Sequence, residues 1–183
     1  MDIHALHLPD VKLVRPRRFG DERGWFMETY RREAFLAAGI TDDFAQDNQS
    51  FSAARGTVRG LHLQKPPHAQ AKLVRVLSGR ILDVAVDLRR SSPTFGQHVA
   101  VEIPDDGTSI YVPVGFAHGF CTLTENVTIA YKVSDTYAPQ AEAGVLWNDP
   151  ALGISWPVSD TEATLSAKDR QLPRLADLEP VFP

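Results

Sequence analysis

Short segments in which polar and apolar residues alternate follow one another along most of the chain. In the clearest, residues 81–88, the even positions Leu82, Val84, Val86 and Leu88 share one face, and Ile81, Asp83, Ala85 and Asp87 share the other. A period of two is typical of a β-strand, because successive side chains point to opposite faces. The two carboxylates indicate that the second face is either exposed to water or part of a site.

Similar patterns predict several further strands and a single clear helix. The strands are expected at residues 11–14, 25–30, 57–63, 72–77, 98–103, 109–112, 119–123 and 126–133. Strong helix formers followed by Gly39 predict the helix at residues 31–38. The tail from residue 151 predicts a loop with one or two helical turns near residues 166–170. Short strands at such spacing favour an antiparallel sandwich or barrel, and without repeats or linkers residues 1–183 read as a single domain.

Composition and charge narrow the class of protein. Hydrophobic residues make up 43% of the 183 residues and charged residues 23%, the balance of a soluble globular protein. The net charge of -4 does not favour nucleic acid as a partner. One cysteine excludes an internal disulfide. The chain has neither an apolar run of membrane-spanning length nor a secretory signal at its start, so we expect no membrane contact and a cytoplasmic location.

Two segments resemble the motifs of the cupin superfamily. Residues 107–122, GTSIYVPVGFAHGFCT, resemble the second motif and place His118 where cupins carry a histidine. Residues 60–79 resemble the first, but metal-binding cupins have His, His and Glu where this chain has His62, Gln64 and Lys72. A divalent metal needs about three imidazole or carboxylate ligands, and Lys72 instead brings a positive charge. We therefore expect no metal; a metal-dependent cupin is a weaker alternative.

Taken together, the motifs resemble the dTDP-4-dehydrorhamnose 3,5-epimerase family over nearly the whole chain. Small departures are Leu63, where the family usually has an aromatic residue, and Ala71, where glycine is common. The matching segments, in chain order, are FGDERGWFMETY (19–30), QDN (46–48), VRGLH (58–62), AQAKLVRV (69–76), DVAVDLR (83–89), SPTFG (92–96), GFAHGF (115–120), YK (131–132), WNDP (147–150) and SAKDR (166–170).

The resemblance implies an all-β, cupin-type jelly-roll barrel with a few short helices. It also implies epimerisation at C3 and C5 of dTDP-4-dehydro-6-deoxy-D-glucose, which gives dTDP-4-dehydro-L-rhamnose in dTDP-L-rhamnose biosynthesis. The reaction needs a base, an acid and a group that holds an enolate oxygen, but no cofactor. Two alternatives stay open: an epimerase that acts at one carbon only, and a non-catalytic cupin that binds a nucleotide sugar.

The residue types suit this chemistry. His62 is the expected base, because the ordinary pKa of histidine lies near the working pH. Asp169 is expected to orient its ring, with Asp83 as a competing partner. Lys72 would offset charge on the enolate oxygen, and Tyr131 would return the proton from the opposite face.

The remaining expectations concern binding and assembly. Arg23 and Arg59 are expected on the diphosphate, because a guanidinium matches phosphate oxygens. By resemblance, Glu28, Gln46 and Asn48 bind the nucleotide end, and His118, Glu142 and Lys168 also contact the ligand. The family resemblance further implies a homodimer that exchanges N-terminal strands within residues 1–14, with Arg23 or Glu28 in the partner's pocket. The glycines and proline at 60, 79, 107, 113 and 115 are expected at turns, and Cys121 is expected to be buried beside His118 without a catalytic part.

Overall fold

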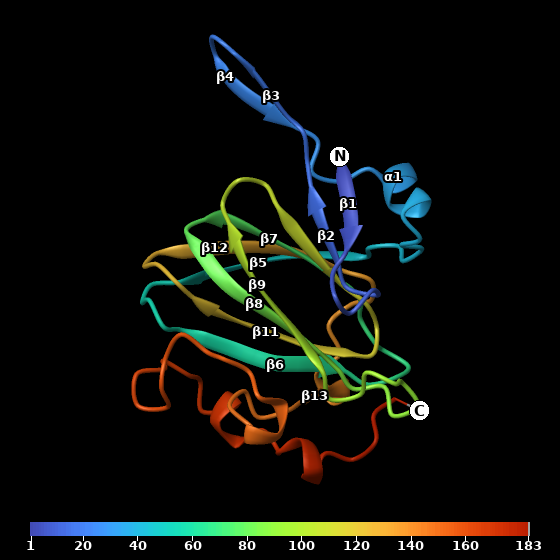
Figure 1. Ribbon diagram of the computed structural model, residues 1–183, viewed down its shortest axis with the longest axis vertical. Helices are drawn as coiled ribbons and strands as arrows, with labels where there is room; N and C mark the ends of the chain where they lie inside the picture. Colours follow the sequence, from blue (N-terminus) through green and yellow to red (C-terminus); the bar gives the residue numbers. More distant parts are fainter. Residues whose placement is uncertain (183) are drawn as a thin grey trace.

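Two antiparallel sheets face each other across an apolar core in the computed structural model, which describes residues 1–182 (Figure 1). The six-stranded sheet has the order β1-β2-β10-β7-β12-β5, and the five-stranded sheet has the order β13-β6-β11-β8-β9. A separate two-stranded sheet pairs β3 with β4. The predicted all-β, jelly-roll class with few short helices is confirmed.

The strands largely cover the predicted segments, with β1, β3, β5 and β13 added. Their bounds are β1 Asp2–Ala5, β2 Lys12–Arg15, β3 Arg18–Asp21, β4 Gly24–Met27, β5 Gln46–Ser52, β6 Val58–Gln64, β7 Lys72–Ser78, β8 Arg80–Asp87, β9 His98–Pro104, β10 Ser109–Val112, β11 Phe116–Thr122, β12 Val127–Val133 and β13 Glu142–Gly144. The helix α1 spans Arg32–Ala37, and short 3₁₀ turns occur at η1 Pro139–Ala141, η2 Pro150–Leu152, η3 Asp169–Gln171 and η4 Leu175–Asp177.

Strand β8 contributes to two apolar cores, because its successive side chains point to opposite faces of the sheet. Ile81 and Ala85 face the interior between the sheets, where they pack with residues such as Phe116 and Ile129. Val84 and Val86 face the other way and pack beneath the C-terminal segment, which is drawn in red below β6 in Figure 1. The face that carries the carboxylates is therefore the interior one, and the expectation that it could be exposed to water is wrong.

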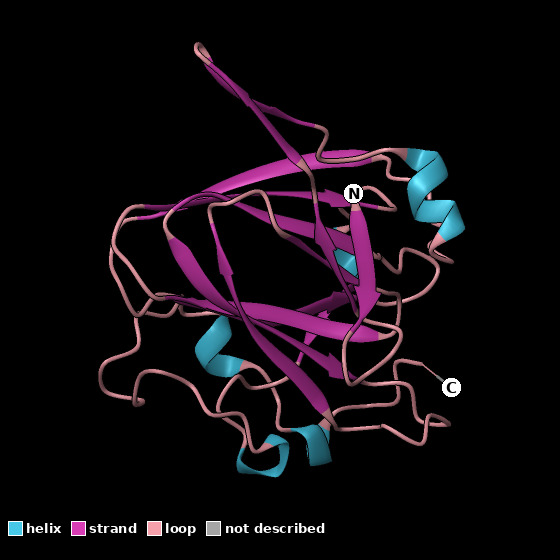
Figure 2. Cartoon of the chain, turned by 45° about the horizontal axis from the view of Figure 1, so that its top comes forward, coloured by secondary structure: helices cyan, strands magenta, loops and turns pink. Residues whose placement is uncertain are grey.

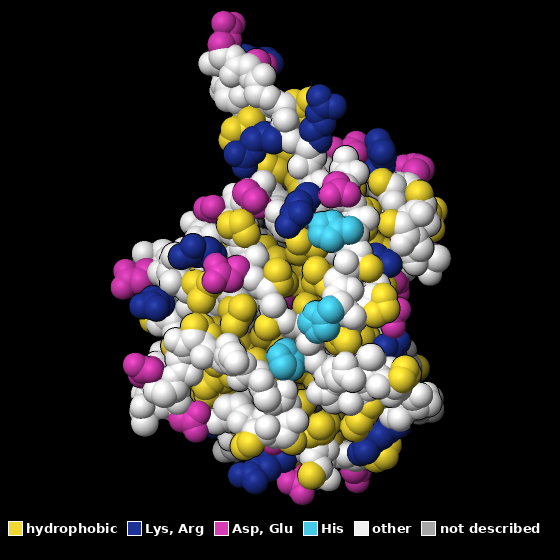
Figure 3. Space-filling view, in the orientation of Figure 1, with side chains coloured by type: hydrophobic (Ala, Val, Ile, Leu, Met, Phe, Trp, Pro, Cys, Tyr) yellow, Lys and Arg dark blue, Asp and Glu magenta, His cyan; other side chains and the backbone are white. Residues whose placement is uncertain are grey.

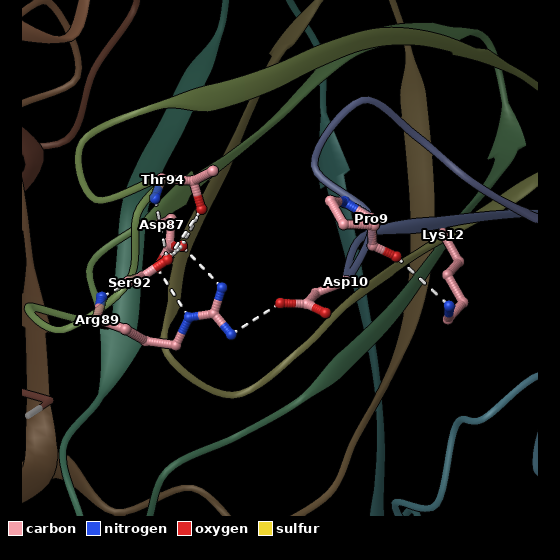
Figure 4. Close-up of polar contacts among 7 residues, drawn as sticks. All are labelled: Pro9, Asp10, Lys12, Asp87, Arg89, Ser92 and Thr94. Atoms are coloured by element: carbon pink, nitrogen blue, oxygen red, sulfur yellow. Dashed lines mark hydrogen bonds and ion pairs between the residues drawn. The ribbon is translucent and has the colours of Figure 1, made fainter.

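The interior carboxylate of Asp87 is neutralised at one end of β8. It accepts hydrogen bonds from Arg89, Ser92 and Thr94, and Arg89 also pairs with Asp10 at 2.8 Å (Figure 4). Burial raises the pKa of Asp87, but these hydrogen bonds outweigh it and bring the pKa down to about 2. The network thus joins the turn between β1 and β2 to the loop that follows β8.

The β3–β4 hairpin projects away from the sheets (Figures 1 and 2), and stands clear of the body in the space-filling view (Figure 3). Its aromatic side chains Phe19, Trp25 and Phe26 are 49%, 59% and 68% exposed. The segment expected to be exchanged, residues 1–14, lies instead in the chain's own six-stranded sheet, through the β1–β2 and β2–β10 pairings. The part of the chain that leaves the body is therefore the hairpin that follows this segment.

Candidate active site

An irregularity in β6 determines where the side chains of Arg59 and His62 point. His118 of β11 pairs with His62, but Phe120 pairs with Arg59, so β6 has one extra residue at this point. Gly60 lies at the bulge with φ +138°, a region that favours glycine. Gly60 is thus inside a strand, and its expected place at a turn is wrong; Gly79, Gly107 and Gly115 do lie between strands.

The bulge explains why Arg59 and His62 share a face. Residues three apart in a regular strand point to opposite faces. Here Val58 and Leu61 belong to apolar clusters under the C-terminal segment, although Val58 also borders the cavity. Arg59 and His62 both line this cavity, which has a volume of about 430 Å³ and lies between the sheets. A regular strand would turn one of the two side chains away from this cavity.

His62 is held by the carboxylate of Asp169 in η3. His62 Nε2 and Asp169 Oδ1 are 2.6 Å apart; the histidine side chain is 36% exposed and the aspartate 4%. Burial raises the pKa of Asp169, but the hydrogen bond and charge of His62 lower it further, so the net shift is downward. An Nε2–H donated to this carboxylate leaves Nδ1 free to accept a proton. The competing partner, Asp83, bonds His118 instead.

Lys72 and His118 also line this cavity. The Lys72 ammonium donates to the carbonyl oxygen of His62 at 3.2 Å. Burial lowers the pKa of Lys72 to about 8, against the opposing effect of the Asp83 charge. His118, only 7% exposed, lies 2.8 Å from Asp83 through its Nε2.

Tyr131 lines the cavity from β12, in the sheet opposite to the one that carries His62. Burial raises the pKa of the Tyr131 phenol, against a smaller opposing effect of the Arg59 charge. Its hydroxyl therefore keeps its proton at neutral pH. Arg59 is tied to β5 by hydrogen bonds to the Ser52 hydroxyl and the Phe51 carbonyl.

A second cavity, of about 310 Å³, adjoins the first and shares His62, Lys72 and Tyr131 with it. Its wall contains Gln46, Asn48 and Glu142, while Lys168 lines the first cavity and pairs with Glu142. The site is therefore a two-part cleft with the three shared side chains in the middle.

Tyr137 is a lining residue of the second cavity that sequence reasoning missed. Its ring is 56% exposed, and its backbone N–H donates to the Gln46 side chain at 3.0 Å. Gln64 holds the same loop by accepting from the Ala138 N–H and donating to the Thr136 carbonyl. An exposed aromatic residue in a loop gives no periodic signal, so nothing in the pattern pointed to Tyr137.

Arg23 and Glu28 are the two expected site residues that line neither cavity. Arg23 lies at the tip of the projecting hairpin and pairs with Asp21, and Glu28 follows β4 and pairs with Arg31 at 3.5 Å. All the other expected residues lie around the cleft. Cys121 is fully buried, as expected, and packs on the outward face of β11 with Val58.

The cupin metal positions are occupied by groups with other partners. The Gln64 amide donates to the carbonyl oxygens of His68 and Thr136 and accepts from the Ala138 N–H. The Lys72 ammonium donates to the carbonyl oxygen of His62. Among residues 1–182, no three His, Cys, Asp or Glu side chains form a cluster that could hold a metal ion. Within the same range no helix has the length and apolar character needed to cross a membrane.

Comparison with known proteins gives consistent matches. The sequence model of a family described as dTDP-4-dehydrorhamnose 3,5-epimerase matches residues 5–177. A relative of that name from Pseudomonas aeruginosa is 49% identical over 181 residues, or 98% of each chain. The crystal structure of the Bacillus anthracis enzyme, with TDP and PPi bound, has a TM-score of 0.90 at 48% identity, covering 94% of this chain and 98% of the other. The crystal structure of a Legionella pneumophila 3,5-epimerase in complex with dTDP-4-keto-L-rhamnose has a TM-score of 0.91 at 40% sequence identity. The match covers 97% of this chain and 94% of the other.

Proposed function

The chain belongs to the dTDP-4-dehydrorhamnose 3,5-epimerase family, and we propose that His62 and Tyr131 carry the proton transfers of its reaction. The protein epimerises C3 and C5 of dTDP-4-dehydro-6-deoxy-D-glucose and so forms dTDP-4-dehydro-L-rhamnose, a step of dTDP-L-rhamnose biosynthesis. The geometry of the cleft supports the proposed roles of individual side chains.

The observation that carries the proposal is that His62 and Tyr131 belong to opposite sheets and line the same cavity. Inversion at a carbon requires that a proton leave one face of the sugar and return to the other. A ring bound between the sheets has the imidazole on one face and the phenol on the other. The hydrogen bond from His62 to Asp169 stabilises the imidazolium that forms after the first transfer.

Lys72 acts on the intermediate between the two transfers. Removal of a proton next to the C4 ketone places negative charge on the C4 oxygen. A desolvated ammonium stabilises that charge more strongly than one in water, because the local dielectric constant is lower. Removal of one such donor costs about 2.7–4 kcal/mol of barrier in other enzymes, so Lys72→Met should lower kcat by roughly 10²- to 10³-fold.

The test is proton exchange in deuterated water, followed by NMR of the sugar. The wild-type protein should incorporate deuterium at both C3 and C5, and His62→Ala should bind dTDP but incorporate none. Exchange by His62→Ala at the wild-type rate would refute the assignment of the base. Retained nucleotide binding distinguishes loss of the base from loss of the fold.

The second cavity is the proposed place of the nucleotide. Gln46 and Asn48 offer amide groups for hydrogen bonds to a base, and the exposed ring of Tyr137 offers a stacking surface. Arg59, at the first cavity, is the candidate for the diphosphate. Tyr137→Ala should therefore weaken dTDP binding, measured by calorimetry, while kcat at saturating substrate stays near the wild-type value.

A homodimer is the proposed assembly of this single-domain chain, with the β3–β4 hairpin as its exchanged element. Phe19, Trp25 and Phe26 expose large apolar surfaces on a two-stranded ribbon, which is marginally stable alone in water. Insertion of the hairpin into a partner would bury these side chains. It would also bring Arg23 and Glu28 to the partner's cleft.

Complementation tests this assembly. Arg23→Ala and His62→Ala proteins, each inactive alone, are unfolded together and refolded as mixed dimers. If Arg23 serves the partner's cleft, random mixing should restore about a quarter of the sites, because each mixed dimer has one complete site. No recovery in verified mixed dimers would refute exchange of Arg23, and a monomer in sedimentation experiments would refute the dimer.

A further inference from the structure

Asp83 has the most unusual environment of the carboxylates near the cleft, because it lies in the apolar interior and only one of its oxygens has a partner. We propose that Asp83 is a positioning residue, whose buried carboxylate holds the ring of His118 at the cavity wall and stabilises the ammonium group of Lys72 in the same cavity. The inference rests on the proposed role of Lys72 at the C4 oxygen.

The geometry of β8 and β11 places this carboxylate behind the cleft. Asp83 pairs with Phe120 in the sheet, so its side chain lies diagonally next to His118 on the interior face. Its Oδ2 accepts from His118 Nε2 at 2.8 Å, and both side chains are almost completely buried. The ring of His118 is thereby fixed with Nδ1 as its remaining polar atom.

The other oxygen, Oδ1, is fully buried and has no hydrogen-bond partner among residues 1–182. A buried charge without partners is strongly destabilising, and such groups in native proteins require a reason. A structural core pair would use both oxygens, as Asp87 does on the same strand with Arg89, Ser92 and Thr94. The Asp83 carboxylate has one hydrogen bond in the interior and a second oxygen without a partner, which suits an electrostatic role.

The negative charge of Asp83 favours the protonated form of Lys72. Burial alone lowers its pKa, and Asp83 is the group that opposes the fall and leaves the pKa at about 8. Without Asp83, Lys72 would lose its proton closer to neutral pH and could no longer offset charge on the enolate oxygen. The other titratable or charged groups that line the same cavity are Arg59, His62, His118, Tyr131, Lys168 and Asp169.

The decisive variant is Asp83→Asn, because the amide oxygen can still accept from His118 while the charge is lost. A neighbouring opposite charge favours the charged form of a group, so its loss should lower the Lys72 pKa further. A downward shift of about one unit would lower the protonated fraction of Lys72 at pH 8 about fivefold, and kcat should fall with it. The alkaline limb of the kcat profile should move down by about one unit, while the Kd for dTDP stays unchanged.

The titration of Lys72 is also measured directly, by NMR of protein labelled with ¹³C-lysine, with Lys72→Arg used to assign the signal. Asp87→Asn is the matched control, since Asp87 lies on the same strand, is equally buried and faces Arg89 instead. It should leave both the Lys72 titration and the alkaline limb in place.

The outcomes separate the two proposals. An unchanged Lys72 titration in Asp83→Asn would overturn this inference even if Lys72 is essential. Wild-type activity in Lys72→Met would overturn the role of Lys72 at C4, whatever Asp83 does. Asp83→Ser, which is smaller and also uncharged, repeats the titration if Asp83→Asn does not fold. If neither folds, Asp83 serves stability, and the inference is wrong.

Discussion

Gly60→Ala tests whether the bulge in β6 positions the catalytic side chains. A Cβ at residue 60 would lie 2.5 Å from the Cα of Gly119 and 3.1 Å from the carbonyl oxygen of His118. Carbon atoms in contact are about 3.5–4.0 Å apart, so β6 and β11 would have to separate locally by about 1 Å. His62 lies two residues after the substitution and Arg59 directly before it, so both would move.

The structure gives the expected size of two separate effects. A misplacement of about 1 Å in a catalytic constellation can lower the rate by about 10²-fold, and we expect a loss of kcat of that order. Overpacking should lower the free energy of unfolding by about 1–3 kcal/mol. The positive φ adds strain for any side chain, and Gly39→Ala controls for it: Gly39 has φ +79° and open space where its Cβ would lie.

The assay combines kcat, measured by product formation at saturating substrate, with urea unfolding of both variants. Gly39→Ala should lose some stability and keep the wild-type kcat. Gly60→Ala should remain folded at 25 °C but lose activity. A folded Gly60→Ala protein whose kcat lies within twofold of the wild-type value would refute the argument, because the bulge would then be dispensable for placing His62.

Three further predictions follow from the ionisable groups. Activity should fall as the pH rises through about 8, because Lys72 must keep its proton. The Lys72→Arg variant should lack this fall in activity at alkaline pH even if it is slower, since arginine stays charged. Tyr131→Phe should still exchange substrate protons for deuterium, but with retained configuration by NMR, because His62 alone can return a proton to the face it came from. The lowered pKa of Asp87, about 2, stabilises the fold by about 2 kcal/mol above pH 4, and this contribution should be lost as the pH falls towards 2. Urea unfolding should show that loss in the wild-type protein between pH 5 and pH 2, but not in Asp87→Asn.

Alternation along the chain was sufficient to place the strands that pack an apolar face. In residues 81–88 it separated the faces correctly, because one face packs under the C-terminal segment and most of the other packs in the interior. It failed at β5, whose residues are Gln-Asp-Asn-Gln-Ser-Phe-Ser. The inner face of β5 carries Gln46, Asn48 and Ser50, which line the cleft and not the core, so the apolar signal of a strand is missing.

The motifs were sufficient to predict which residues form the site, but not which of their side chains bond to one another. His62 and Asp169 are 107 residues apart, and only the folded chain brings η3 under β6. The motifs therefore favoured Asp169 as the partner of His62 but left Asp83 open as a competitor. Gly60 was expected at a turn with the other motif glycines, but a bulge inside a strand can also require the positive φ that glycine adopts.

The place where the apolar core ends determines the chemistry of the cleft. Phe120 and Ile129 belong to the interior core and also form the floor of the first cavity. This floor excludes water from Lys72, which lowers its pKa and also strengthens its attraction for an anionic oxygen. Stronger desolvation would lower the Lys72 pKa so far that the group would lose its proton at neutral pH. A neutral amine would no longer attract the anionic oxygen. Substitutions that deepen the apolar floor should therefore raise activity only at lower pH, and an additional buried anion such as Asp83 is what allows a dry site to keep a charged lysine.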